Sequence, residues 1–177
     1  MSLFSKISSF FHHSSSDRLI GYLRKKGVEI GNNCKFRVPL SAQIDVTRPY
    51  LIKIGNNVDM NANFKIYTHD WASLVFIAKY KQMVNSAGKV AVGDNVYFGA
   101  DVTILRGVTI GDNCVIAAGS VVTHSIPSNS VAAGVPCRRI CSIDDYFQKR
   151  ISEALPEAVL VVKEFEKNMD DIQRKKN

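Results

Sequence analysis

The sequence lacks several features that would place it in other classes of protein. No apolar run approaches the roughly 20 residues that a membrane-spanning helix needs. Its four cysteines form no Cys-x-x-Cys pair, and Cys137 and Cys141 have no His or Asp partners at metal-binding spacing. Nothing at the start reads as a cleavable signal. We therefore expect no integral membrane protein, no disulfide scaffold and no metal. The expected location is the cytoplasm, with a peripheral position at the inner face of the membrane as the alternative.

A central basic surface is also absent. The chain has 177 residues, of which 46% are hydrophobic and 22% charged, as in one globular domain. Its net charge is +7, but residues 1–27 hold five basic residues and one acidic one, whereas 28–135 are near balance with nine and seven. No stretch interleaves Arg or Lys with aromatic residues as a base-stacking surface does. Nucleic acid is therefore not an expected partner.

What the sequence does contain is a period of six. Bulky apolar residues recur at Val92, Phe98, Ile104, Ile110, Ile116 and Val122. Four positions after each comes a second apolar or small series: Val96, Val102, Val108, Cys114, Ser120 and Ile126. An α-helix cannot hold a strict period of six, and a simple amphipathic strand alternates every two residues. The pattern predicts short strands joined by corners, with three such hexads closing one coil that stacks on its neighbours.

Turn residues and earlier repeats extend this prediction. Gly-Asp-Asn occurs at 93–95 and 111–113, and Gly-Asn-Asn at 55–57, which suits sharp corners. An earlier coil begins at Ile30 and is expected to continue through Phe36 and Leu40, with a slip of phase around residues 48–52. Ile66 and Ile104 fit the same position of successive coils, but they lie more than twice as far apart as three hexads allow. This places an insertion at about 72–91.

We divide the chain into three parts. Residues 1–27 form an N-terminal arm with a short helix at about 17–26, 28–141 form the repeat domain, and 142–177 form a helical segment that Pro156 interrupts. The arm carries Leu3, Phe4, Ile7, Phe10 and Phe11 at near-helical spacing. This suits packing over the coil end or onto a neighbouring subunit, and the alternative is a weak membrane-surface helix.

The segment 92–140, which closes with AAGSVVT and IPSNSVAAGVPCRRI, resembles the hexapeptide-repeat acyltransferases. The similar branch contains maltose, galactoside, xenobiotic and bacterial polysaccharide O-acetyltransferases, and THDW at 68–71 looks most like the sugar and surface-polysaccharide members. The resemblance implies an all-β core in the form of a left-handed parallel β-helix with terminal helices. It also implies a homotrimer with active sites between subunits, acetyl-CoA as co-substrate, and one histidine as general base.

His69 is the candidate base, because it lies at a coil edge just before the insertion. Histidine suits this role, since its ordinary pKa near 6.5 lies close to working pH. Asp70 is expected either to orient His69 or to bind an acceptor hydroxyl, although adjacent strand residues point to opposite faces. Trp71 either stacks on a sugar ring or, as we slightly favour, anchors the insertion. Asn61 and Tyr67 are further candidates for the acceptor site.

The expected cofactor residues follow from the resemblance. In this family the pantetheine arm runs along a column of small residues between two subunits. The residues here that match such positions or follow them are Gly99, Ala100, Ala117, Ala118, Thr123 and His124. Arg138 and Arg139 could meet the phosphates of CoA, and the alternative is a solvated basic pair. Gly107, in the coil column after His69, would let a ligand lie close to the backbone.

The leading hypothesis is an O-acetyltransferase that moves an acetyl group from acetyl-CoA to a sugar or surface-polysaccharide precursor. One alternative is an acetyltransferase acting on a small molecule, of the xenobiotic or serine type. Another is a β-helix scaffold without catalytic activity.

Overall fold

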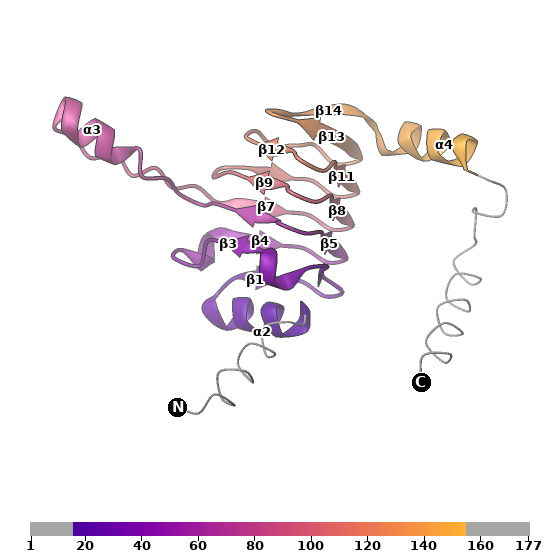
Figure 1. Cartoon of the computed structure of the whole chain (residues 1–177), viewed down its shortest axis with the longest axis horizontal. Coiled ribbons are helices and arrows are strands. Elements are labelled where there is room, and N and C mark those ends of the chain that lie inside the picture. Colours follow the sequence, from indigo (N-terminus) through magenta and orange to yellow (C-terminus); the bar gives the residue numbers. More distant parts are fainter. Residues whose placement is uncertain (1–15, 155–177) are drawn as a thin grey trace. The chain divides into compact units, whose positions relative to one another are not determined.

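The computed structural model describes residues 16–154. The chain divides between Ile143 and Asp144 into two compact units. The described part of the second unit, residues 144–154, is almost entirely helix α4 (Ile143–Glu153), which carries Asp144 and Asp145 in its first turn. The first unit is a stack of coils built from short strands (Figure 1). None of the helices between residues 16 and 154 is long and apolar enough to cross a membrane.

Three sheets form the sides of the coils, and the chain visits them in turn. Sheet A has the order β1 (Glu29–Ile30), β4 (Ile52–Ile54), β7 (Val90–Val92), β10 (Thr109–Ile110). Sheet B has the order β14 (Cys137–Ser142), β13 (Ser130–Gly134), β11 (Cys114–Ile116), β8 (Val96–Phe98), β5 (Val58–Met60), β2 (Lys35–Phe36). Sheet C has the order β12 (Val121–Val122), β9 (Thr103–Ile104), β6 (Lys65–Ile66), β3 (Gln43–Ile44). Apart from the antiparallel β13–β14 hairpin, all neighbours are parallel, which gives the predicted left-handed β-helix.

The period of six forms the core. Every member of the two apolar series that begin at Val92 and Val96 is buried. Within β4, β5, β7, β8 and β11 the outer residues are buried and the middle one is not, because successive strand residues point to opposite faces. Along the axis Phe64 packs against Phe36 and Phe98, with ring centroids 6.3 and 4.8 Å apart. The predicted inward positions of these two series are therefore confirmed.

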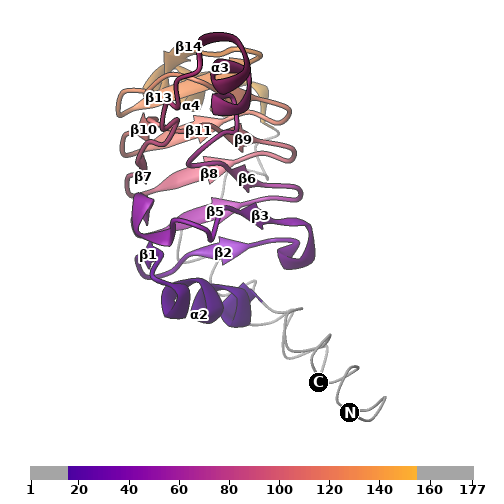
Figure 2. The same cartoon turned by 90° about the vertical axis from the view of Figure 1, so that its left-hand side faces the viewer.

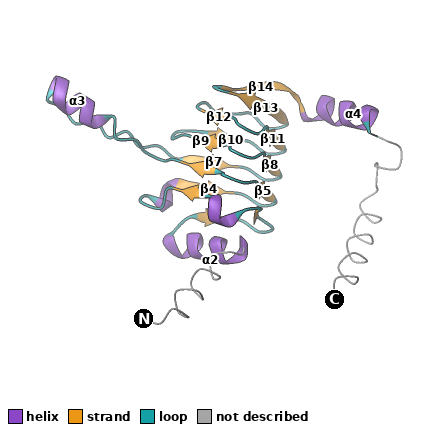
Figure 3. Ribbon diagram, in the orientation of Figure 1, coloured by secondary structure: helices purple, strands orange, loops and turns teal. Residues whose placement is uncertain are grey.

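The corner between sheets A and B carries an asparagine ladder. Asn33, Asn57, Asn95, Asn113 and Asn129 all have φ between 54° and 58°, a left-handed conformation that asparagine tolerates better than most residues. Each Nδ2 except the last donates to Oδ1 of the next asparagine, over 2.8–3.1 Å. The ladder joins the coils at the corner where Figure 3 shows loop between the strands.

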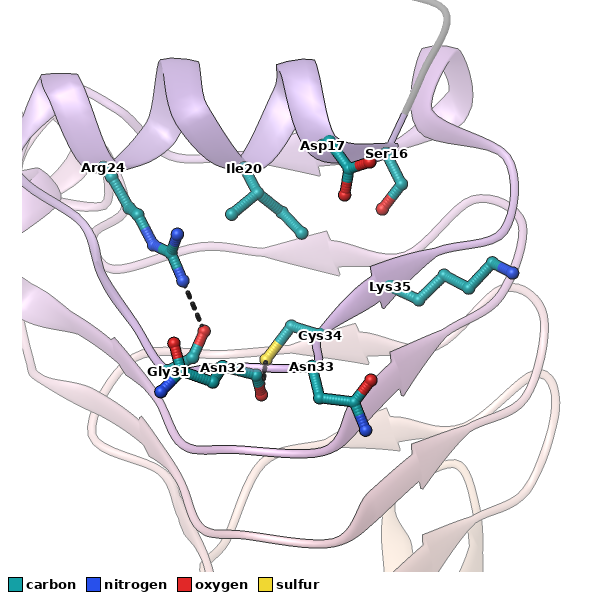
Figure 4. A pocket seen from close by; sticks show the side chains of 9 residues that line it. All are labelled: Ser16, Asp17, Ile20, Arg24, Gly31, Asn32, Asn33, Cys34 and Lys35. Atoms are coloured by element: carbon teal, nitrogen blue, oxygen red, sulfur yellow. Dashed lines mark hydrogen bonds between the residues drawn. The ribbon is translucent and has the colours of Figure 1, made fainter.

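The open end of the first coil is covered by helix α2 (Ser16–Lys26), as predicted, with Ile20 and Leu23 buried. Arg24 fastens it, since its Nε donates to the carbonyl of Ile30 over 3.1 Å and its Nη2 to that of Gly31. Beside these bonds a cavity of about 410 Å³ lies between α2 and residues 31–35 (Figure 4).

The first coil is longer than expected. Glu29 pairs with Lys53, whereas Ala91 pairs with Thr109, so the first coil exceeds a regular one by one hexad. Two short 3₁₀ turns, η1 (Pro39–Ser41) and η2 (Pro49–Leu51), hold the additional residues. The sequence indicated only the slip near residue 48. Leu40, predicted to lie inside, is 56% exposed, because it belongs to η1 and not to a strand.

The predicted insertion is present, but its end is earlier than predicted. Ile66 pairs with Ile104, which confirms that these two residues hold the same position in successive coils. Val90 and Ala91 belong to β7, so the insertion ends before them. It contains helix α3 (Ser73–Tyr80), which Figure 1 shows at the end of an extension from the coils and Figure 2 shows from that side, in front of them.

Candidate active site

His69 lies where the chain leaves sheet C and enters the insertion. It forms an isolated antiparallel bridge with Ala87, and Gly88 N–H donates to the carbonyl of Thr68 over 2.8 Å. The two ends of the insertion are thus paired at His69. The histidine side chain is 18% exposed, so it is partly buried and still open to solvent.

Asp45 holds the His69 ring. Its Oδ2 lies 2.6 Å from His69 Nδ1 and also accepts hydrogen bonds from the hydroxyl and the backbone N–H of Thr68. Its Oδ1 accepts from the hydroxyl and the backbone N–H of Thr47. Burial alone would raise the pKa of Asp45, but the hydrogen bonds from Thr47, Thr68 and His69 outweigh it and hold the pKa well below its usual range.

The contact fixes the tautomer of His69. An ionised carboxylate only accepts hydrogen bonds, so Nδ1 of His69 carries the proton and Nε2 has a free lone pair. Asp45 lies 24 residues before His69 and was not predicted from the sequence. Gln43 of β3 pairs with Lys65 of β6, which is 22 residues further on instead of the regular 18, because η2 lengthens this coil. A count that assumes regular coils therefore does not find Asp45.

Asp70 contacts Arg106 instead of the His69 ring. Its Oδ2 accepts from Arg106 Nε over 2.8 Å, and its Oδ1 accepts from the backbone N–H of Ala72. The hydrogen bond from Arg106 holds the pKa of Asp70 below its usual value. The suggestion that Asp70 orients His69 is therefore wrong, because Asp45 occupies that position. Arg106 is a second residue at this site that was not predicted from the sequence.

Two cavities meet His69. One cavity, of about 250 Å³, lies at the base of the insertion, and Trp71 is among the residues that line it. The other, of about 280 Å³, lies toward the next coils. Residues lining the first cavity are Thr47, Arg48, His69, Asp70, Trp71, Ser73, Met83, Val84, Asn85 and Ser86. Residues lining the second are Tyr67, His69, Asp70, Leu105, Arg106 and Thr123.

The acceptor-site candidates are not all together. Tyr67 lines the second cavity, where its hydroxyl donates to Gln43 Oε1 over 2.8 Å. Trp71 is 69% exposed and meets the His69 ring edge-on at 6.0 Å. This exposure does not support Trp71 as an anchor of the insertion, and its contact with His69 leaves the stacking of a sugar ring as a prediction. Asn61 lies at the other end of β6, where its Nδ2 donates to the hydroxyl of Tyr97.

Three of the cofactor candidates form a cluster near the second cavity. His124 Nδ1 lies 2.7 Å from the hydroxyl of Thr123 and 3.3 Å from Arg138 Nη1. Arg139, the next residue of β14, instead donates from Nε to the hydroxyl of Ser130. Successive strand residues point to opposite faces, so only Arg138 shares this cluster.

The small-residue candidates lie before the first residues of the sheet C strands, whereas His69 lies after the last residue of its strand. Gly99 and Ala100 precede β9, and Ala117 and Ala118 precede β12, whereas His69 follows β6. The amides of Gly99 and Ala117 donate to the carbonyls of Ile116 and Ala132, so a ligand here would use other atoms. Gly99 also has a packing role, because a Cβ at that position would clash with the backbone nitrogen of Ala118.

Gly107 differs from Gly99, because a Cβ at position 107 would meet no atom within 4 Å. Only its backbone conformation, with φ of +79°, favours glycine at this position. The space beside it therefore remains open to a ligand. In residues 16–154 no group of three or more His, Cys, Asp and Glu side chains could hold a metal ion.

Hexad coils in a three-sided β-helix, with a hydrogen-bonded histidine between two cavities, define the class of hexapeptide-repeat transferases. Comparison with known proteins agrees with this. Residues 89–124 match the family model described as the hexapeptide repeat of succinyl-transferase. Protein CapG of Staphylococcus aureus is 39% identical over 75% of this chain and 76% of its own length. The chain spans about half the length, 49% and 47%, of two further curated relatives.

Solved structures give the same result. A maltose O-acetyltransferase from Clostridium difficile 630 is 31% identical, with a TM-score of 0.50 over 78% of this chain and 83% of that one. A hexapeptide-repeat acetyltransferase from Vibrio cholerae, solved with acetyl-CoA, is 22% identical, with a TM-score of 0.50 over 70% and 75%. The chain belongs to the hexapeptide-repeat acetyltransferase family, as its resemblance predicted.

Proposed function

We propose that this acetyltransferase moves an acetyl group from acetyl-CoA to a hydroxyl of a sugar or surface-polysaccharide precursor, with His69 as general base. The observation that carries the proposal is the hydrogen bond between His69 Nδ1 and Asp45, because it leaves Nε2 free to accept a proton beside two cavities. Membership of an acetyltransferase family supports the donor, and the likeness to a maltose O-acetyltransferase supports a sugar acceptor.

The reaction then proceeds as follows. Nε2 of His69 takes the proton of the acceptor hydroxyl while the oxygen attacks the thioester carbonyl carbon. The resulting tetrahedral intermediate collapses, the carbon–sulfur bond breaks, and the sulfur leaves with the bonding electrons. The imidazolium returns its proton to that sulfur, which gives free CoA and the acetyl ester. Asp45 stabilises the imidazolium through its negative charge and keeps the ring in place, so it is a positioning residue.

The two cavities suggest separate places for the two substrates. Thr123 lines the cavity that also contains Arg106, and the next residue, His124, contacts Arg138. The positive charge of Arg138 suits the phosphates of the donor, so we place the donor on this side. The cavity at the base of the insertion is then left for the acceptor, with Trp71 on its side. We further propose a homotrimer in which Gly99, Ala100, Ala117 and Ala118 of one copy border the donor groove of another.

The test is acetyl transfer to a panel of sugars, followed as release of free thiol, in the wild type and in His69→Asn. Asparagine keeps an N–H that can donate to Asp45 but cannot accept a proton, so kcat should fall by about 10²–10⁴-fold. The melting temperature should stay the same, which excludes unfolding as the cause. Activity of His69→Asn within twofold of the wild type would remove His69 from the role of base.

A non-catalytic scaffold predicts a different result. Acetyl-CoA at about 100 times its Kd should stabilise an enzyme that binds it by about 2.7 kcal/mol. If acetyl-CoA leaves the melting temperature unchanged, the scaffold becomes the better hypothesis. An acceptor panel that includes serine and small aromatic alcohols separates the small-molecule alternative from the sugar acceptor.

A further inference from the structure

Arg48 lines the cavity at the base of the insertion, but the proposed reaction gives it no role. The lining of this cavity, about 250 Å³ in volume, contains three side chains that carry charge or can gain it: Arg48, His69 and Asp70. Asp70 is paired with Arg106, and His69 with Asp45. Arg48 has no such partner, because its Nη1 donates to Asn85 Oδ1, a neutral amide, over 3.0 Å.

The charge of Arg48 is therefore uncompensated. Among the carboxylates of residues 16–154, none forms an ion pair with it. A guanidinium stays protonated at any pH that the protein meets, so this half-buried cation attracts anions to the cavity. The bond to Asn85 engages one Nη1 hydrogen and leaves Nε and Nη2 for a bidentate pair with a carboxylate or a phosphate.

We infer that the acceptor is an acidic sugar, whose anionic group binds Arg48 while one of its hydroxyls reaches His69. The inference rests on the proposed function. Arg48 and His69 line the same small cavity, so one sugar residue can contact both. The cavity also has an apolar side formed by Trp71, Met83 and Val84, which suits the C–H face of a sugar ring. Arg48 would thus bind the anionic group of the sugar, and the sugar ring would pack against Trp71, Met83 and Val84.

A purely structural role for Arg48 makes a different prediction. In that case the bond from Arg48 to Asn85 would serve only to join η2 to the base of the insertion. Asn85→Ala breaks this bond and keeps the cation. Arg48→Gln removes the cation and, because its side chain is shorter, the bond to Asn85 as well, so its effect beyond that of Asn85→Ala reports the charge. The pair of variants therefore separates the charge from the tether.

The experiment measures kcat/KM for sugars that differ only in charge: galactose with galacturonate and galactose 6-phosphate, and glucose with glucuronate and glucose 6-phosphate. The wild type should prefer an acidic member over its neutral partner by at least about tenfold, the size expected for hydrogen bonds to a charged group. Comparison of the uronates with the phosphates shows which anion is bound.

Arg48→Gln should bring this ratio close to one, mainly by raising KM for the acidic sugar. The ratio for Arg48→Lys should lie between those of the wild type and Arg48→Gln, because lysine keeps the charge but cannot form the two parallel hydrogen bonds of a guanidinium. Asn85→Ala should keep the preference, whatever its effect on overall rate. The inference is overturned if the wild type prefers the neutral sugar in both sets, if Arg48→Gln keeps the ratio, or if Asn85→Ala abolishes it equally. If the wild type acetylates no sugar at all, the proposed function itself fails, and the inference fails with it.

Discussion

Nδ1 of His69 lies 2.6 Å from Oδ2 of Asp45, whose side chain is only 6% exposed. The two residues come from successive coils of the β-helix. The hydrogen-bond donors around Asp45 keep its carboxylate ionised, and the carboxylate in turn keeps the proton of His69 on Nδ1.

Asp45→Asn tests this pair in catalysis. The amide cannot offset the positive charge that His69 gains in the reaction, so kcat should fall by at least about tenfold with little change in either KM. Asp59→Asn is the matched control, because Asp59 pairs with Arg37 on sheet B, away from His69. This control should keep kcat within twofold. An equal loss in both variants would contradict the role assigned to Asp45.

The same residue should affect stability in acid. A carboxyl group whose pKa is lower in the folded state stabilises the protein at pH values above its unfolded pKa, about 3.9. That contribution is lost as pH falls below this value toward the folded pKa. The free energy of unfolding should therefore fall more steeply between pH 5 and about pH 3 in the wild type than in Asp45→Asn. Parallel curves from chemical denaturation at these pH values would refute the prediction.

The phenylalanine column should govern the stability of the coils. Phe64 is completely buried between Phe36 and Phe98. Phe64→Ala should lower the free energy of unfolding by about 3–5 kcal/mol, because it removes apolar contacts and leaves a cavity. Tyr50→Ala, at a side chain that is 73% exposed, should change it by no more than about 0.5 kcal/mol. Urea unfolding measures both, and similar losses would show that the column does not control stability.

The asparagine ladder offers a test of backbone and side chain together. Asn95 has φ of +56° and bonds both Asn57 and Asn113. Asn95→Ala loses both bonds and must hold an unfavourable backbone conformation, which costs about 1–2 kcal/mol more. Asn95→Gly loses the same bonds without that strain, so its melting temperature should lie between those of Asn95→Ala and the wild type. Equal melting temperatures for the two variants would show that the backbone conformation contributes little.

Much of the fold could be read from local pattern. The period of six marked the buried residues from Val92 to Ile126, since each short strand points alternate side chains inward. The insertion was located by counting from Ile66 to Ile104, although its end was placed too late. Leu40 was misplaced because an apolar residue in a 3₁₀ turn looks the same, in sequence, as one in a strand.

The functional site was only partly readable. His69 was predicted from its position before the insertion, and the structure places it beside two cavities, while its role stays a proposal. Asp70 was its neighbour in sequence, but the strand directs the two side chains apart, and Asp70 meets Arg106. Arg138 and Arg139 looked equivalent in sequence, and only the pairing of β14 with β13 separates them.

The sequence by itself determined the β-helix, its core and its family, because those depend on residues that recur at a fixed spacing. The partners of His69 and Arg48 were decided only by the tertiary structure. On sheet C, Gln43 pairs with Lys65, 22 residues further on instead of the regular 18, so a count of regular coils cannot bring Asp45 to His69. The base of the insertion likewise brings Asn85 to Arg48, although the two are far apart in the sequence. Such contacts depend on how irregular segments close against regular coils, which no local pattern encodes.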